Sequence, residues 1–270
     1  MKYKCLSIAG FDGSGGAGIQ ADLKTFSALG CYGMTILTAL PVQNTCGIRK
    51  IYDIPLQAIA DQLEAIFADI TPDCVKIGML FSEEVIELVS DFLRKNATSI
   101  PLVLDPVMIA KSGDLLLLPS AIDTMINKLI GLCTIITPNL PESYELVGYY
   151  DDQKQIATKL LQLGAKSVLL KGGHNKGWQS NDLFMDETGH IQLLEAKRIN
   201  SKNTHGTGCT LSAAICAFIA RGMPVIDACR YAKNYLTNAI NHSKDYSPGK
   251  GHGSVHHFYH LWPILKSLEV

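Results

Sequence analysis

The chain has 270 residues, of which 47% are hydrophobic and 18% are charged, and its formal net charge is −1. This balance is typical of a well-buried globular protein, and the lack of a basic excess or a run of like charges argues against nucleic acid and anionic membranes as partners. Residues 1–10 lack the apolar stretch of a signal peptide, and no run of about 18 apolar residues is present, so neither a leader nor a membrane span is expected.

Eight cysteines are scattered along the chain, and none of them forms a Cys-x-x-Cys pair. Their spacing does not suggest a zinc site, and a chain with a core of this size does not need disulfides. We therefore expect reduced thiols in a cytoplasmic protein.

Strand patterns alternate with helical patterns from one end of the chain to the other. The first half predicts strands over 4–9, 34–40, 74–80 and 102–106, a hairpin-like segment over 41–53, and helices over 19–29, 56–67 and 83–95. The second half predicts helices over 121–129, 139–147, 152–163, 208–220 and 225–242, strands over 133–137 and 167–173, and a hairpin formed by 181–185 and 191–196. This alternation predicts an α/β fold: a mainly parallel sheet covered on both faces, in one domain spanning residues 1–270.

Polar residues or glycines follow most of the predicted strands, where a core alone would not need them. They are Asp12 with the glycines of 13–18, Gln43, 78–79, Asp105, Asn139 and 171–173. Because ligands of such sheets bind beyond the carboxyl ends of the strands, we expect these residues to surround one site.

The stretch Asn203-Thr204-His205-Gly206-Thr207-Gly208-Cys209 is a glycine loop that opens a helix of small apolar residues. The backbone N–H groups of such a loop lie at the positive end of the helix dipole and can hold a phosphoryl group. Cys209 falls in the first turn, where we expect the pKa of a thiol to be lowered. The alternative is an ordinary turn before a buried helix, and this motif alone does not choose between the two.

A second glycine loop, Gly13 to Gly18, matches G-x-G-x-x-G after a strand. A dinucleotide site also needs an acid about 20 residues further on, and residues 38–42 contain none. The chain also lacks the G-x-x-x-x-G-K-[ST] loop, so a nicotinamide oxidoreductase and a P-loop nucleotidase are both disfavoured.

Asn139 and Glu142 lie three residues apart at the start of a predicted helix, and Asp105 ends a predicted strand. These oxygens could hold Mg²⁺ through water, although helix capping and a turn explain the same residues. His252, His256 and His257 lie in a tail without a nearby carboxylate or cysteine, so we interpret them as a solvated tail or a lid and not as a metal site.

Several stretches agree, in order, with one family. They are 7–25, 43–45, 76–80, 104–108, 110–114, 137–142, 171–174, 202–212, 251–253 and 255–257. Over nearly its whole length the chain resembles the hydroxymethylpyrimidine and phosphomethylpyrimidine kinases of thiamine biosynthesis, within the ribokinase-like superfamily.

The resemblance implies a three-layer α/β/α fold and an ATP-dependent kinase. Its substrate would be 4-amino-5-hydroxymethyl-2-methylpyrimidine, and then the monophosphate of that alcohol. It also implies Mg²⁺, a monovalent cation such as K⁺, and a homodimer. Most ribokinase-like enzymes carry Asp where Cys209 stands; because some pyridoxal kinases also carry Cys, pyridoxal kinase remains the alternative. Phe11 stands where pyrimidine kinases commonly have a small or polar residue.

We expect Cys209 to accept the proton of the substrate hydroxyl, while the N–H groups from Gly206 to Cys209 hold the phosphoryl group. The expected nucleotide and metal residues are Asp105, Thr137, Asn139, Glu142, Lys171, Gly206, Thr207 and Gly208, of which Asp105 and Glu142 would serve Mg²⁺. The expected pyrimidine residues are Gly10, Asp22, Gln43 and Met79. A non-enzymatic binding protein would need the glycine loops but neither Cys209 nor the Asn139/Glu142 pair.

Only one Gly-Thr-Gly-Cys loop is present and no internal repeat is found, so we expect a single site for both phosphorylations. The monophosphate then needs cations near Cys209. The expected candidates are Lys111, in a lid over 111–114, and His252, His256 or His257.

Overall fold

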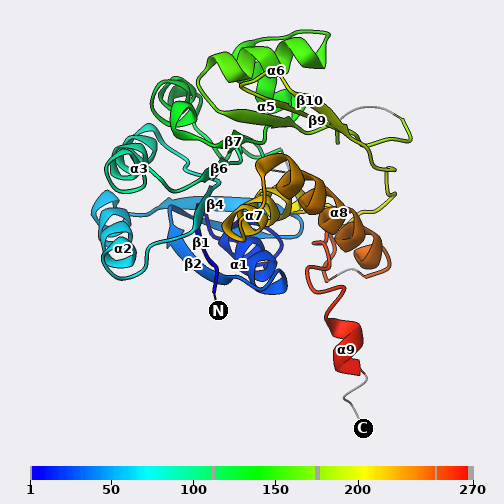
Figure 1. Ribbon diagram of the computed structural model, residues 1–270. Helices are drawn as coiled ribbons and strands as arrows, with labels where there is room; N and C mark the ends of the chain where they lie inside the picture. Colours follow the sequence, from blue (N-terminus) through cyan, green and yellow to red (C-terminus); the bar gives the residue numbers. More distant parts are fainter. Residues whose placement is uncertain (1, 111–112, 174–176, 247, 267–270) are drawn as a thin grey trace.

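A single eight-stranded sheet, in the order β10-β9-β8-β7-β6-β5-β1-β2, forms the centre of the computed structural model (Figure 1). The structure describes residues 2–110, 113–173, 177–246 and 248–266. Strands β2, β1, β5, β6, β7 and β8 pair in parallel, and β9 and β10 continue the sheet in antiparallel pairing. The expected mainly parallel sheet is confirmed.

The sheet strands are β1 (Lys4–Ala9), β2 (Tyr32–Leu37), β5 (Cys74–Ile77), β6 (Leu102–Leu104), β7 (Ile135–Ile136), β8 (Ser167–Leu170), β9 (Asp182–Asp186) and β10 (Ile191–Leu194). The main helices are α1 (Gly18–Ala28), α2 (Leu56–Asp69), α3 (Glu83–Asn96), α5 (Leu140–Val147), α6 (Gln153–Gln162), α7 (Thr207–Ala220) and α8 (Val225–Ser243). A short helix, α9 (Trp262–Lys266), stands beyond the body near the C-terminus (Figure 1).

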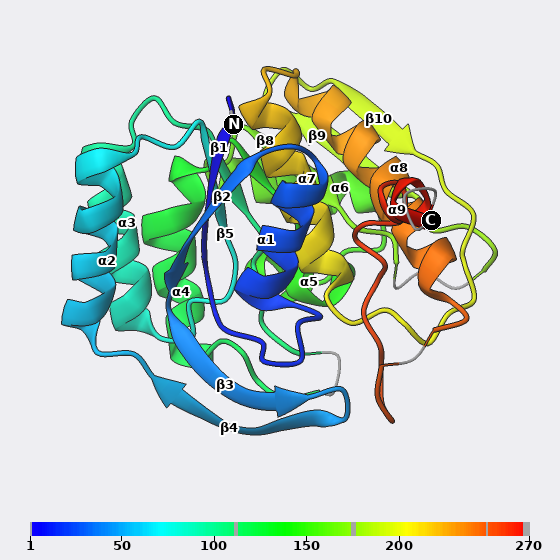
Figure 2. The ribbon, with the colours of Figure 1, turned by 90° about the horizontal axis from the view of Figure 1, so that it is seen from below.

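Alternating side chains of the strands build two separate cores, one on each face of the sheet. In β1, Leu6 and Ile8 pack into the core shared with α2, α3 and α6, while Cys5 packs into the core shared with α1, α7 and α8. Successive residues of a strand point to opposite faces, so residues 5–9 are all buried, and the polar side chain among them, Ser7, donates to Asp22. Figure 2 shows the resulting three layers, with α2 and α3 on one side of the sheet and α1, α7 and α8 on the other.

Two predicted elements differ from the observed ones. The predicted strand 34–40 divides at Thr38, whose hydroxyl donates to the Met79 carbonyl, and the chain then leaves the sheet to form a hairpin of β3 (Ala39–Asn44) and β4 (Gly47–Asp53). The predicted helix 121–129 is a series of short helical turns over 119–132, including α4 (Ile122–Thr124) and a wider turn at Met125–Leu129. The local pattern predicts a helix here but not its changes of pitch.

The β3–β4 hairpin projects from the end of the sheet at which β2 finishes, as Figure 2 shows. Its tip contacts the tail that follows α8: Gly251 donates its backbone N–H to the Thr45 hydroxyl, and His252 donates to the Thr45 carbonyl. The hairpin and the tail therefore border the carboxyl edge of the sheet. Among the described residues, no helix is long and apolar enough to span a bilayer.

Candidate active site

A cavity of about 650 Å³ lies at the carboxyl edge of the parallel strands, where the sequence predicts a site. Residues from both halves of the chain surround it. They include Gly10, Phe11, Gly18, Gln43, Lys76, Met79, Asp105, Met108, Asn139, Glu142, Lys171, Thr204, His205, Gly206, Thr207, Gly208 and Cys209. Of the residues expected after the strands, Gln43, Met79, Asp105, Asn139 and Lys171 line this cavity, whereas Asp12 does not.

The two glycine loops are joined by a hydrogen bond between the side chains of Asp12 and His205. The buried carboxylate of Asp12 accepts hydrogen bonds from the backbone N–H groups of Gly16 and Ala17, and His205 Nε2 lies 2.8 Å from its Oδ2. Although burial opposes ionisation, these hydrogen bonds and the His205 contact hold the pKa of Asp12 below its usual range. Asp12 thus fixes the first loop and ties it to the second.

The same junction explains one glycine of the second loop. Gly206 has φ 73°, and a Cβ there would lie 1.8 Å from the Gly16 carbonyl oxygen. A side chain is excluded both by the left-handed conformation and by the adjacent backbone. Gly206 therefore lets the two loops touch and lets α7 begin at Thr207.

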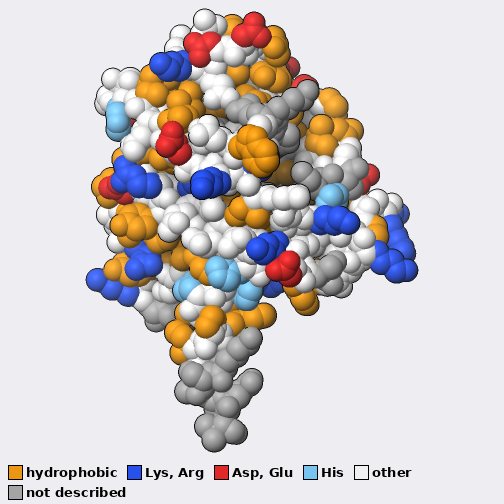
Figure 3. Space-filling view, turned by 90° about the vertical axis from the view of Figure 1, so that its right-hand side faces the viewer, with side chains coloured by type: hydrophobic (Ala, Val, Ile, Leu, Met, Phe, Trp, Pro, Cys, Tyr) orange, Lys and Arg blue, Asp and Glu red, His pale blue; other side chains and the backbone are white. Residues whose placement is uncertain are grey.

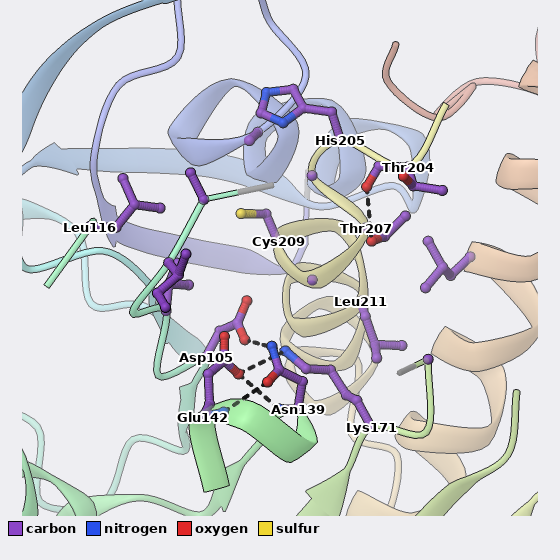
Figure 4. Close-up of a pocket in the computed structure, with 18 of the residues that line it drawn as sticks. Asp105, Leu116, Asn139, Glu142, Lys171, Thr204, His205, Thr207, Cys209 and Leu211 are labelled. Carbon is purple, nitrogen blue, oxygen red and sulfur yellow. Dashed lines mark hydrogen bonds and ion pairs between the residues drawn. The ribbon is translucent and has the colours of Figure 1, made fainter. Parts of the chain in front are cut away.

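Cys209 points from the first turn of α7 into the cavity (Figure 4). Its sulfur accepts the backbone N–H of Gly18, the first residue of α1, so the N-termini of two helices meet at this thiol. The expected lowering of the Cys209 pKa is nevertheless wrong: burial raises it to about 11, against the opposing effects of the Lys76 ammonium and the Gly18 N–H. The expectation failed because the sequence shows the helix start but not the loss of solvent.

Asp22 is fully buried and is not among the residues that line the cavity, so its expected part in closing the pyrimidine pocket stays a prediction. Its fully buried carboxylate accepts from the Ser7 hydroxyl at 2.5 Å and from Lys76 Nζ at 2.8 Å. Lys76, in β5, does line the cavity. The contact of Asp22 with the site therefore passes through Lys76.

A second charged cluster lies at the ends of β6, β7 and β8. Lys171 Nζ is 2.7 Å from Asp105 Oδ1 and 3.6 Å from Glu142 Oε2 (Figure 4). Asn139 and Glu142 also cap α5 reciprocally, since each side chain accepts the backbone N–H of the other. The capping interpretation is thus correct, and the same Glu142 carboxylate also faces the cavity.

This cluster has one more carboxylate than it has ammonium groups. Burial and the nearby Asp105 raise the pKa of Glu142 to about 7, although Lys171 and the Asn139 N–H oppose the rise. Among the described residues, no group of three or more His, Cys, Asp or Glu side chains is placed to hold a metal. The surplus carboxylate fits a cation that keeps most of its water, as Mg²⁺ does.

The other expected pyrimidine residues lie on the apolar side of the cavity. A Cβ on Gly10 would come within 2.8 Å of the Met79 sulfur, so glycine there allows Met79 to reach the cavity wall. The Gln43 side-chain amide donates to the Phe11 carbonyl at 3.1 Å, which fixes its orientation. These residues form an apolar wall with one polar amide.

Some expected residues lie away from the cavity. Thr137 is buried, and its hydroxyl contacts Asp105 Oδ1 at 3.4 Å, so it packs behind the acid cluster. His252, His256 and His257 are absent from the cavity lining, and Lys111 falls outside the described residues. Histidines instead gather near α9, where His256 contacts Trp262 and His242 stacks on Tyr259 (Figure 3).

His257 also cannot supply the expected positive charge. Its ring is buried against the Thr210 hydroxyl, and burial lowers its pKa to about 3. Lys76 and His205, which line the cavity, were not among the expected residues. Two features of the sequence could have pointed to them. Lys76 is a charged residue within the apolar run Cys74-Val75-Lys76-Ile77, and His205 directly precedes the glycines of the second loop.

Solved structures define the class of this fold and site. The chain is similar to the pyridoxal kinase from Staphylococcus aureus in complex with AMP-PCP and pyridoxal, with a TM-score of 0.86 and 33% identity over 96% of this chain and 95% of that one. The phosphomethylpyrimidine kinase from Clostridium difficile matches with a TM-score of 0.78 and 44% identity, over 88% of this chain and all of the other. The class is that of ribokinase-like small-molecule kinases.

Sequence comparison then identifies the family. A hydroxymethylpyrimidine/phosphomethylpyrimidine kinase from Rhizobium meliloti is 45% identical over 267 residues, which cover 97% of this chain and 99% of the relative. The family model described as phosphomethylpyrimidine kinase matches residues 12–256. The chain belongs to the phosphomethylpyrimidine kinase family.

Proposed function

We propose that this chain uses ATP to phosphorylate 4-amino-5-hydroxymethyl-2-methylpyrimidine and then phosphorylates the monophosphate to the diphosphate, in thiamine biosynthesis. The observation that carries the proposal is identity of 45% to a relative named for both activities, across almost the full length of both chains. The cavity supplies the matching features: an apolar wall with one amide, a thiol, a glycine loop and a charged cluster.

Pyridoxal kinase activity is the second candidate, because solved pyridoxal kinases share this fold at TM-scores of 0.86 to 0.87. Their identity to the chain is 33% to 36%, below the 44% and 45% of the pyrimidine kinases quoted above. We therefore assign pyridoxal as the poorer substrate.

The transfer itself follows from the residues at the second glycine loop. The substrate hydroxyl gives its proton to the Cys209 sulfur in its thiolate form, and its oxygen attacks the terminal phosphorus of ATP. A new P–O bond forms, the bond to the bridging oxygen of ADP breaks, and ADP leaves with that electron pair. The N–H groups from Gly206 to Cys209 stabilise the charge that develops on the phosphoryl oxygens.

The charged cluster belongs to the nucleotide side in this proposal. Lys171, which contacts Asp105 and Glu142, would meet the phosphates of ATP, and these two carboxylates, with Asn139 holding Glu142 in place, would hold hydrated Mg²⁺. Bound Mg²⁺ would neutralise phosphate charge during transfer. On the other side, the oxygen of the Gln43 amide accepts from the amino group of the pyrimidine, and Met79 and Gly10 pack against the ring.

The resemblance further supports K⁺ as an activating ion, a homodimer and a cytoplasmic location. The hairpin offers exposed Val42 and Tyr52 as apolar surface for a second copy. Light scattering on the purified chain tests the dimer, and turnover with K⁺ replaced by a bulky organic cation tests the ion.

A substrate panel tests the main proposal. Hydroxymethylpyrimidine, its monophosphate, pyridoxal and ribose are each incubated with the chain, ATP and Mg²⁺, and ADP release is measured. We expect the highest kcat/KM for the two pyrimidines. Faster turnover of pyridoxal than of either pyrimidine would favour the second candidate.

A further inference from the structure

Lys76 is a buried cation that the mechanism above does not use. It lies in β5, its side chain is fully buried, and it is nevertheless one of the residues that line the cavity. Lysine is almost never buried completely unless a specific partner holds it. A fully buried lysine that lines the same cavity as the Cys209 thiol therefore needs an explanation.

One carboxylate holds this ammonium in place. Asp22 Oδ2, which also accepts from Ser7, lies 2.8 Å from Lys76 Nζ, and it is the single hydrogen-bond acceptor found for that amine among the described residues. An ammonium has three N–H donors, so this contact leaves donors facing elsewhere. The backbone leaves space beside them, because a Cβ on Gly78 would lie 2.7 Å from Lys76 Nζ.

Cys209 is the reactive group on which this ammonium acts. Lys76 exerts the largest favourable influence on the ionised sulfur, ahead of the opposing Asp22 and Asp105 charges and of the Gly18 N–H. α7, which begins with the turn that carries Cys209, packs against β5, which carries Lys76, and both residues line the same cavity. The thiolate would thus face an N–H at the start of α1 and an ammonium from β5.

We propose that Lys76 is a positioning residue of the phosphoryl transfer: its sealed ammonium, aligned by Asp22, is the counter-charge of the Cys209 thiolate. The proposal rests on the proposed function for its link to turnover, but not for its chemistry. Without this charge, the thiolate would be less stable still at a site where burial already opposes ionisation, and less of it would form to accept the proton of the substrate.

Lys76 is not itself the proton acceptor. Burial alone would lower the pKa of Lys76, but Asp22, Cys209 and Asp105 together raise it above its ordinary value. The amine therefore stays charged at neutral pH and has no vacant lone pair. It can influence the reaction through its field while the proton moves to sulfur.

The test measures the thiol directly, in the resting protein and without substrate. Iodoacetamide alkylates Cys209 as the thiolate, and peptide mass spectrometry separates it from the exposed Cys46. In Lys76→Met we expect the pKa of Cys209 to rise by about one to three units, so alkylation at a fixed alkaline pH slows roughly tenfold per unit. In Asp22→Asn the side-chain oxygen can still accept from Lys76 Nζ, and Cys209 and Asp105 still favour the charged amine, while the charge that opposes the thiolate is removed. Alkylation of Cys209 in this variant should therefore become faster than in the wild type.

Opposite shifts in these two variants distinguish the proposal from a structural role of the ion pair, which would predict similar losses in both. The double variant Lys76→Met/Asp22→Asn removes both charges and controls for stability, with its melting temperature recorded. The proposal would be overturned if Cys209 were alkylated in Lys76→Met at the wild-type rate, or if its alkylation slowed in both single variants. If Lys76→Met does not fold, the Asp22→Asn variant alone tests the proposal. An alkylation rate in Asp22→Asn that equals the wild-type rate or is slower would contradict the proposal.

Turnover provides an independent readout. Lys76→Met should lower kcat and move the alkaline rise of its pH profile upward, while KM for ATP stays close to the wild-type value. A chain that fails to phosphorylate any pyrimidine would refute the proposed function, yet the alkylation rates would still report on Lys76 and Cys209.

Discussion

Two lysines reach the same cavity from the same sheet, and their surroundings differ in a way that separates their roles. Lys171 contacts the two carboxylates of Asp105 and Glu142 and is 14% exposed, whereas Lys76 contacts one carboxylate and is fully sealed. The first group can meet a charged ligand that arrives from solvent. Lys76 is instead placed to act on a fixed group of the protein, which here is the Cys209 thiol.

The largest expected effect comes from removing the thiol. Cys209→Ala should fold normally, since the side chain is small, and should lose about 10² to 10⁴-fold in turnover, the usual contribution of a general base. Because we expect one site for both phosphorylations, the alcohol and the monophosphate should lose activity together. Separate steady-state assays on each substrate measure this.

The matched control is Cys209→Asp, which should retain more activity than Cys209→Ala because a carboxylate can accept the same proton. Turnover of Cys209→Ala within a few-fold of wild type would show that Cys209 is not the base. A Cys209→Ala protein that converts the monophosphate at the wild-type rate would end the single-site model.

Removing the other lysine should have a smaller and different effect. Lys171→Met takes away a charged partner of the phosphates, worth about 1.5–3 kcal/mol, which corresponds to roughly ten- to a hundred-fold in kcat/KM for ATP. Alkylation of Cys209 should slow less than in Lys76→Met, since Lys171 influences that sulfur more weakly than Lys76 does. If Lys171→Met instead slows alkylation as strongly as Lys76→Met does, the division of roles between the two lysines is wrong.

The sequence predicts the site residues around Lys171 but not the buried pair of Lys76 and Asp22. Asp105, Asn139 and Lys171 follow strands, so the rule that ligands bind at carboxyl ends finds them. Lys76 lies inside a strand and Asp22 inside a helix, where periodicity predicts only core. Their pairing depends on the strand order β6-β5-β1 and on α1 covering that face, which one sequence does not state.

The same limit explains the Cys209 thiol. A glycine loop before a helix correctly predicts its position, because N–H groups and the dipole are local properties. Its pKa depends on burial and on Lys76, Asp22 and Asp105, which come from three other segments. Local geometry was therefore predictable, and the balance of distant charges was not.

A smaller effect is expected at the apolar side of the cavity. Gln43→Ala should raise KM for the pyrimidine by the equivalent of about 1–3 kcal/mol, because it leaves a polar group of the ring without a partner. KM for ATP should hardly change, since the nucleotide side depends on the Lys171 cluster. Equal changes in both KM values would place Gln43 away from the ring.

The smallest effect on turnover is expected from His257, a second sealed titratable group, which lies behind α7 against Thr210. Burial lowers the pKa of His257 to about 3, so the folded protein keeps the ring neutral while the unfolded chain takes up a proton below about pH 6.5. Stability from this group is thus complete above that pH and is lost as the pH falls toward 3, by up to about 1.4 kcal/mol per pH unit. His257→Gln can keep the contact with Thr210 but does not titrate, so its free energy of unfolding should decline less between about pH 7 and pH 4.5, as measured by urea denaturation, while turnover near neutral pH hardly changes. If the free energy of unfolding of His257→Gln declines with falling pH as steeply as that of the wild type, burial does not keep His257 neutral. That result would also weaken the argument that burial fixes the charge of Lys76.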